Sequence, residues 1–135
     1  MKQRTEITNL PNRSFTVEYN GKKLEIGTGK DLAVISGPCV IDSEDLIMRT
    51  AERLKEICER QKTPLIFKSS YEKDNRGSEK NWRGPMAEEG LKILAKVRKE
   101  FDVPVLTDVH RVEDVAMVAE YVDVLQIPAY MCQQT

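Results

Sequence analysis

Short apolar runs alternate with helix-like segments from residue 32 onward, and this rhythm limits the possible folds more than any other feature. The apolar runs are LAVISG (32–37), PLIFKS (64–69), VPVLTDV (103–109) and DVLQIPA (123–129). Between them, the periodicity predicts helices from Asp42 or Ser43 to about 59, over about 86–101 and over 112–121. Strands that alternate with helices indicate βαβ units and a parallel sheet.

The helical segments also indicate which side chains face a core. Helical spacing places one group of apolar residues on a single face of each of the first two helices. These groups are Ile47, Ala51, Leu54 and Cys58, and Leu91, Leu94 and Val97. The run LAVISG lacks any alternation of polar and apolar residues, which predicts a strand buried on both faces.

Residues 1–30 differ from the rest of the chain. The runs RSFTVEY and KKLEI alternate on either side of Asn20-Gly21, a dipeptide that favours a tight hairpin turn. We expect an N-terminal β-hairpin that lies against the main domain and carries no chemistry. The predicted organisation is a hairpin extension over 1–30 and an α/β domain over 31–135.

The α/β domain has too few predicted strands for a closed barrel. The chain has 135 residues and stops at MCQQT, directly after the fourth strand. A closed (β/α)8 barrel takes about 250 residues. The pattern fits either an open four-stranded α/β domain or the first half of a TIM barrel, and a last strand without a covering helix favours the half-barrel.

Charge balance and cysteine content limit the partners and the compartment. With 21 Lys and Arg against 22 Asp and Glu, the net charge of -1 provides no general attraction for nucleic acid or an anionic membrane. No stretch approaches the roughly 18 apolar residues of a membrane span. Three cysteines without paired spacing fit a reducing compartment. We expect a cytoplasmic protein without nucleic-acid or membrane partners.

Polar residues follow the apolar part of every predicted strand. They are SGPC at 36–39, KSS at 68–70, TDVH at 107–110, and Gln126, Pro128 and Ala129 around the fourth strand. The carboxyl ends of parallel strands meet at one edge of a sheet, where ligands bind in α/β folds and barrels. The four strands together predict a ligand site at that edge.

The segment after the second strand is locally basic. From 68 to 83 it carries five cationic side chains, Lys68, Lys73, Arg76, Lys80 and Arg83, against the three acidic ones Glu72, Asp74 and Glu79. This local excess suits a phosphate ester, because guanidinium groups bind phosphate bidentately and ammonium groups act as point charges. The segment has no Gly-rich P-loop pattern, which disfavours a nucleotide.

Several of these residues also have simpler interpretations. Cys58 lies on an apolar helix face, where core packing is expected. Cys39 fits a small hydrophobic residue and a metal thiolate equally well. His110 could be an ordinary surface or hydrogen-bonded histidine, Asp108 could cap the next helix, and the charges of the 72–83 loop could form a solvated face. A cysteine with a carboxylate and a histidine nearby also suggests a divalent metal.

The order and spacing of several motifs resemble the 3-deoxy-D-manno-octulosonate 8-phosphate synthases. The motifs are SGPCVIDSEDL, FKSSYEKDNR, WRGP, EEGLKIL, VPVLTDVH, VAEYVDVLQIPAY and CQQT, over about 32–135. The resemblance implies a (β/α)8 TIM-barrel transferase, present here with about its first four strands. It implies condensation of phosphoenolpyruvate with D-arabinose 5-phosphate for the inner core of Gram-negative lipopolysaccharide. No organic cofactor is implied, and the complete protein would be a homotetramer.

The resemblance also implies roles for residues at matching positions. Lys68 would approach the phosphoenolpyruvate carboxylate, Lys73 the sugar aldehyde, and Asp108 the sugar hydroxyls or the metal neighbourhood; these three are the expected catalytic residues. The expected substrate-binding residues are Ser70, Asn75, Arg76, Ser78, Arg83, Gln126, Pro128 and Ala129.

Cys39 matches the metal-dependent branch of the family, so the resemblance implies a divalent metal bound through this thiol. The other ligands of that branch, a His, a Glu and an Asp, would lie beyond Thr135. His110 is therefore outside the ligand set that the resemblance implies.

Three positions depart from the family pattern. Gly77 replaces a phosphate-binding Ser, for which Ser78 could substitute, while Asp74 replaces a small residue and Gln133 replaces an Arg. These departures affect the choice of sugar acceptor more than the type of reaction.

Two alternatives stay open. The sister 3-deoxy-7-phosphoheptulonate synthase uses erythrose 4-phosphate, but KDNR at 73–76 disfavours it, since that enzyme has a lysine-proline-arginine loop there. The other alternative is a non-catalytic half-barrel, which would expose two sheet edges. We expect the 135-residue chain alone to be inactive.

Overall fold

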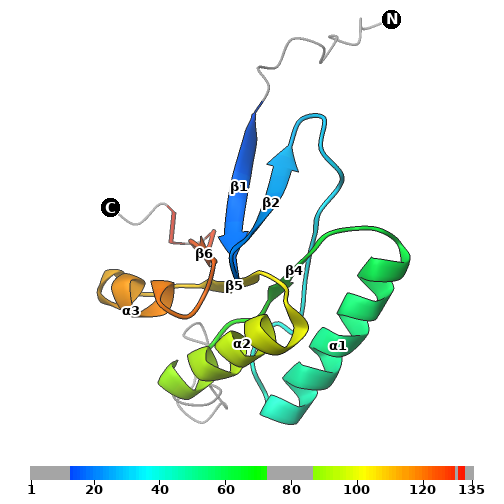
Figure 1. The fold of residues 1–135 in the computed structure, drawn as a ribbon. Coiled ribbons are helices and arrows are strands. Elements are labelled where there is room, and N and C mark those ends of the chain that lie inside the picture. The colour runs from blue at the N-terminus through cyan, green and yellow to red at the C-terminus, as the bar shows by residue number, and fades with distance from the viewer. Residues whose placement is uncertain (1–12, 73–86, 130, 133–135) are drawn as a thin grey trace, which may run out of the picture.

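The computed structural model describes residues 13–72, 87–129 and 131–132, and Figure 1 shows their arrangement. The elements in chain order are β1 (Ser14–Tyr19), β2 (Lys22–Gly27), β3 (Val34–Ser36), α1 (Glu44–Arg60), β4 (Leu65–Lys68), α2 (Ala87–Phe101), β5 (Val105–Asp108), a 3-10 helix (Val112–Asp114), α3 (Val115–Ala119) and β6 (Val124–Gln126). β1 and β2 form an antiparallel hairpin. β3, β4, β5 and β6 form a parallel sheet in that order. The predicted alternation of strands and helices is confirmed.

Local sequence explains where helix α1 begins. Ser43 has an extended backbone, and its hydroxyl accepts a hydrogen bond from the Leu46 amide at 3.3 Å. Glu44 and Asp45 place negative charge in the first turn, which complements the helix dipole. The helix therefore starts at the position that the sequence predicts.

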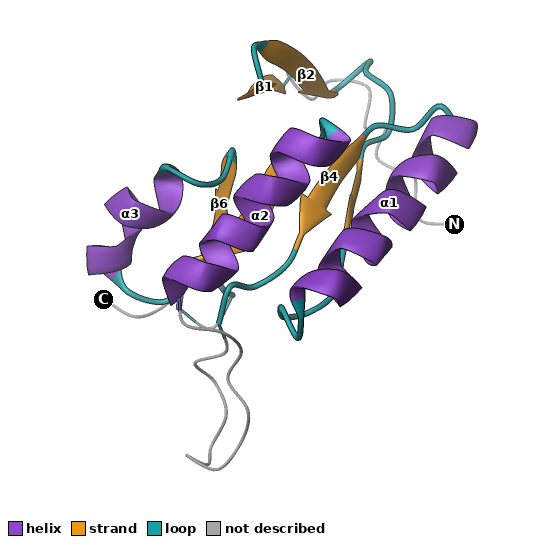
Figure 2. Ribbon diagram, turned by 60° about the horizontal axis from the view of Figure 1, so that its bottom comes forward, coloured by secondary structure: helices purple, strands orange, loops and turns teal. Residues whose placement is uncertain are grey.

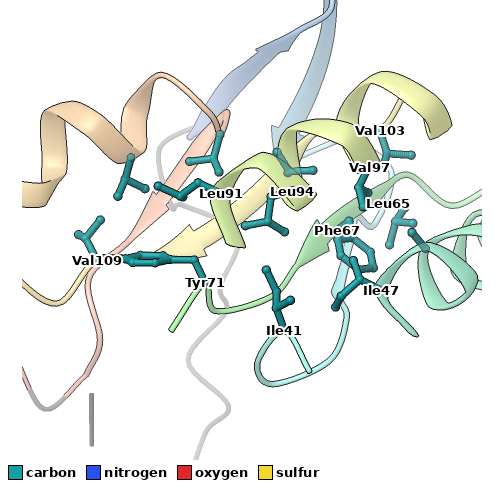
Figure 3. Packing of buried hydrophobic residues seen from close by; sticks show 14 of the residues in the cluster. Ile41, Ile47, Leu65, Phe67, Tyr71, Leu91, Leu94, Val97, Val103 and Val109 are labelled. Carbon is teal, nitrogen blue, oxygen red and sulfur yellow. The ribbon is translucent and has the colours of Figure 1, made fainter. Parts of the chain in front are cut away.

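The main core lies between the sheet and the helices, which Figure 2 shows side by side along the sheet. Leu65 and Phe67 of β4 point toward this core, and Figure 3 shows them beside Ile47 of α1. The predicted inward residues are confirmed: Ile47, Ala51, Cys58, Leu91, Leu94 and Val97 are buried, and Leu54 packs against them in part.

The hairpin packs on the face of the sheet that points away from the helices. Val17 of β1 joins Ile66 and Leu106 in a separate buried cluster, and Figure 1 shows the hairpin and the helices α1 and α2 on opposite sides of the sheet. At its turn, Asn20 donates a hydrogen bond to the Arg98 carbonyl at 2.9 Å. The prediction that the hairpin lies against the main domain is confirmed.

One prediction about these elements is wrong, and another is confirmed in part. Strand LAVISG is not buried on both faces, because β3 lies at the edge of the described sheet and Ile35 is 58% exposed outside the hairpin cluster. The helix predicted over 112–121 is present over 112–119, with its first turn as the 3-10 helix and the rest as the short α3. Val118 is buried and Met117 packs against the main core, whereas Val112 in the 3-10 turn is 85% exposed. None of the described helices is long and apolar enough to cross a membrane.

Candidate functional site

Side chains from three neighbouring strands point to one face at the carboxyl edge of the sheet. Lys68 ends β4, Asp108 ends β5 and Gln126 ends β6. Lys68 is in register with Leu106, and Asp108 with Gln126. Because side chains alternate along a strand, all three point to the same side as Leu106, away from the helices. For these three residues, the polar side chains at the strand ends lie at one edge of the sheet, as the sequence predicts.

A cation and a carboxylate face each other within this group. Lys68 Nζ lies 3.9 Å from Asp108 Oδ1, and the two side chains are only 22% and 13% exposed. Lys68 Nζ also donates a hydrogen bond to Ser70 Oγ at 3.1 Å. Asp108 Oδ1 is buried and has no hydrogen-bond partner among the described residues. The pair can therefore bind an anion at the ammonium and a hydroxyl at the carboxylate.

The segment after β3 brings Cys39 beside this group. Val40 forms an isolated parallel bridge with Ser70, and the Ser70 amide donates to the Cys39 carbonyl at 3.3 Å. Gly37 permits this approach, since a Cβ atom there would lie 1.9 Å from the Lys68 carbonyl oxygen. The structure thus brings together the predicted site residues Cys39, Ser70 and Lys68.

Cys39 fits a metal site as one exposed thiol donor. Among the described residues, no group of three or more His, Cys, Asp or Glu side chains is placed to hold a metal ion. The described part of the chain therefore offers this thiol without a complete ligand set. Cys58, by contrast, is buried in the core, as its helical position predicts.

His110 and Glu72 lie next to the group. The sequence placed His110 among the polar strand-end residues but outside the implied ligand set, and Glu72 among the charges of the loop, so neither was an expected site residue. His110 Nε2 lies 3.2 Å from Asp108 Oδ2, and Nδ1 lies 4.0 Å from Glu72 Oε1. The signal that could have indicated His110 is its position two residues after Asp108, since alternate residues of an extended segment share a face.

Tyr71 packs against the His110 ring, with ring centroids 6.0 Å apart. Burial raises the pKa of the Tyr71 hydroxyl, which keeps it protonated. Asp108 is not the helix cap that was considered, because the backbone cap of the 3-10 helix is Arg111.

The remaining predicted residues divide into two groups. Gln126 and Ala129 are exposed and Pro128 is buried, all at the β6 end of the edge. The predicted residues Lys73, Asn75, Arg76, Ser78 and Arg83, and the departures Asp74, Gly77 and Gln133, lie outside the described residues.

Comparison with known proteins identifies a family and several relatives of this chain. The DAHP synthetase I family matches residues 9–135. Three relatives are named 2-dehydro-3-deoxyphosphooctonate aldolase. The relative from Acidithiobacillus ferrooxidans is 56% identical over 111 residues, which is 82% of this chain and 40% of that protein. The one from Trichlorobacter lovleyi is 51% identical over 121 residues, with 90% and 44% covered.

The relative from Burkholderia mallei is 52% identical over 111 residues, with 82% of this chain and 39% of that protein covered. The chain thus spans about two fifths of the length of these curated relatives. Since the family match extends over most of the sequence, the chain belongs to the DAHP synthetase I family.

Proposed function

We propose that the complete protein condenses phosphoenolpyruvate and D-arabinose 5-phosphate with water to give 3-deoxy-D-manno-octulosonate 8-phosphate and inorganic phosphate. The observation that carries this proposal is the Lys68–Asp108 pair, 3.9 Å apart and largely buried at the carboxyl edge of a parallel sheet. The name of the three relatives supports the same activity. The sheet would then be the first half of a (β/α)8 barrel in a cytoplasmic enzyme of lipopolysaccharide biosynthesis.

The reaction needs two anionic substrates held face to face. The enol carbon of phosphoenolpyruvate attacks the sugar aldehyde, water adds to the resulting cationic carbon, and phosphate leaves. Lys68, held toward Ser70 at 3.1 Å, would bind the phosphoenolpyruvate carboxylate. Asp108 would accept hydrogen bonds from sugar hydroxyls through Oδ1. Such positioning and charge stabilisation can lower the barrier without a covalent intermediate.

Residues after β4 and β6 would complete the substrate site. Lys73 would lie near the aldehyde, and the sugar phosphate would bind the loop that follows, with β6 lining the floor. The expected contributors are Ser70, Asn75, Arg76, Ser78, Arg83, Gln126, Pro128 and Ala129. We further propose a homotetramer for the complete protein.

Cys39 would contribute one thiolate to a divalent metal whose other ligands, in the complete protein, would lie beyond Thr135. A metal there would polarise an oxygen atom as a Lewis acid. In support, Cys39 is exposed, and its backbone carbonyl accepts a hydrogen bond from the Ser70 amide at the candidate site.

A chimera tests the activity directly. Residues 1–135 replace the matching N-terminal part of the Acidithiobacillus ferrooxidans relative, and phosphate release from phosphoenolpyruvate is measured with each aldose phosphate. We expect release with arabinose 5-phosphate and only background with erythrose 4-phosphate. A preference for erythrose 4-phosphate would select the sister reaction. Release with neither, from a folded chimera of an active parent, would support a non-catalytic chain.

The 135-residue chain by itself is a second test. We expect no turnover from it, because the described residues hold only part of a substrate and metal site. Measurable phosphate release by the isolated chain would refute this expectation.

A further inference from the structure

A buried imidazole lies between a carboxylate of the candidate site and a carboxylate beside it. His110 is the only histidine of the chain, and its side chain is 5% exposed. Its two ring nitrogens face Asp108 at 3.2 Å and Glu72 at 4.0 Å. Burying a polar ring is unfavourable unless its nitrogens find partners. Nε2 has its partner in Asp108, whereas the buried Nδ1 has no hydrogen-bond partner among the described residues and only faces Glu72. The Asp108 contact therefore fixes the ring, and Glu72 fills the space on its other side.

We propose that Glu72 and His110 are positioning residues that fix the orientation of the Asp108 carboxylate. The effect on turnover rests on the proposed function, whereas the effect on the ring does not. His110 donates from Nε2 to Asp108 Oδ2, which leaves Oδ1 on the side of Lys68. If the carboxylate rotated, it would lose the His110 contact and move Oδ1 away from the Lys68 ammonium.

Glu72 is held from its other side. Arg111 donates a hydrogen bond to Glu72 Oε1 at 3.4 Å and another, through Nε, to Asp114 Oδ2 at 2.9 Å. The Glu72 side chain is 22% exposed, so Arg111 fixes a carboxylate that has little room to move. Glu72 in turn limits how far the His110 ring can rotate about its own side chain.

The backbone that carries Glu72 is also fixed. Tyr71 is fully buried, and its carbonyl oxygen lies so close to α2 that a Cβ atom at Gly90 would be 2.7 Å away. The Tyr71 ring is tilted 42° against the His110 ring. Helix α2, Tyr71 and Arg111 thus hold Glu72 in place. Glu72 in turn restricts the His110 ring, and the ring restricts the orientation of the Asp108 carboxylate.

Ring nitrogen NMR of the 135-residue chain tests the placement without any substrate. With a single histidine, 15N-histidine labelling gives the ring signals of His110 alone. We expect the proton on Nε2 in the wild type and in Glu72→Gln, whose amide can still occupy the space beside Nδ1. Glu72→Ala is expected to change both ring shifts, and Glu113→Ala, at an exposed glutamate of the 3-10 helix, is the matched control.

Two NMR results would overturn the proposal. One is a wild-type ring that carries its proton on Nδ1 alone. The other is a Glu72→Ala spectrum identical to those of the wild type and Glu113→Ala. Thermal unfolding of each variant shows whether a changed spectrum comes from a folded chain.

The chimera described above tests the consequence for catalysis. Loss of a residue that orients a site residue lowers activity on the order of tenfold or more, so we expect that loss of kcat for His110→Leu and Glu72→Ala. His110→Gln, which keeps a donor for Asp108, and Glu72→Gln should stay close to the wild type. Equal kcat for all four variants would refute the positioning role, whereas an inactive wild-type chimera would refute the proposed function and leave the NMR result to decide the placement.

Discussion

Substitution of Gly37 by alanine probes how closely the backbones after β3 and β4 approach at the candidate site. An added Cβ would lie 1.9 Å from the Lys68 carbonyl oxygen and 2.9 Å from its carbonyl carbon. Real Cβ contacts do not fall below 3.0 Å, so the two segments must separate by roughly 1 Å. The atom in the way belongs to the backbone and cannot rotate aside.

The separation strains the hydrogen bonds around the contact. The Ser70 amide donates a hydrogen bond to the Cys39 carbonyl at 3.3 Å, and the Ile41 amide donates one to the Ser70 carbonyl at 3.1 Å. Overpacking costs about 1–3 kcal/mol, and each hydrogen bond that breaks costs about 1 kcal/mol net. We therefore expect Gly37→Ala to lower the free energy of unfolding by about 3 kcal/mol.

Urea unfolding followed by far-UV circular dichroism measures this loss, with Gly29→Ala as the control. At Gly29 no described atom lies within 4 Å of the added methyl group, and φ is +76°. The free energy of unfolding of the control should fall only by the cost of an alanine in the left-handed region, about 1 kcal/mol. If Gly37→Ala lost no more than Gly29→Ala, the close approach of the two backbones would be refuted.

Three further predictions concern the hairpin, the core and the metal. The hydrogen bond with Lys22 lowers the pKa of Asp102 below its ordinary value of 3.8. The stability that this ion pair contributes is therefore present above pH 3.8 and is lost as the pH falls through the lowered pKa. Urea midpoints measured in increasingly acidic buffer should show this loss, and Asp102→Asn should lack it. Asp123 accepts from the Val105 amide at 2.9 Å and from Arg98 at 3.2 Å, so Asp123→Ala should cost about 3 kcal/mol in urea unfolding, and a loss close to zero would contradict these bonds. In the active chimera, chelator should abolish turnover, and Cys39→Asn should make turnover insensitive to chelator; full activity of the unsubstituted chimera in chelator would argue against the metal.

Local signals explain the parts of the fold that were predicted correctly. The 3.6-residue period, the Ser43 cap and the Asn20-Gly21 turn depend on residues close in sequence, and the structure has the corresponding helix starts and hairpin. The polar strand ends were also predictable, because parallel strands bring their carboxyl ends to one edge whatever their side chains are. Lys68 and Asp108 therefore meet where the sequence placed them.

Position in the sheet and long-range contacts could not be read in the same way. The sequence by itself determined the order of strands and helices, their inward faces and the edge that holds the polar residues. The tertiary structure decided that Ile35 is exposed on an edge strand, that the helix after β5 begins as a 3-10 turn, and that Arg111 reaches Glu72 across 39 residues of sequence. Periodicity records which face of an element is apolar, whereas burial and ion pairing depend on which distant segment covers that face.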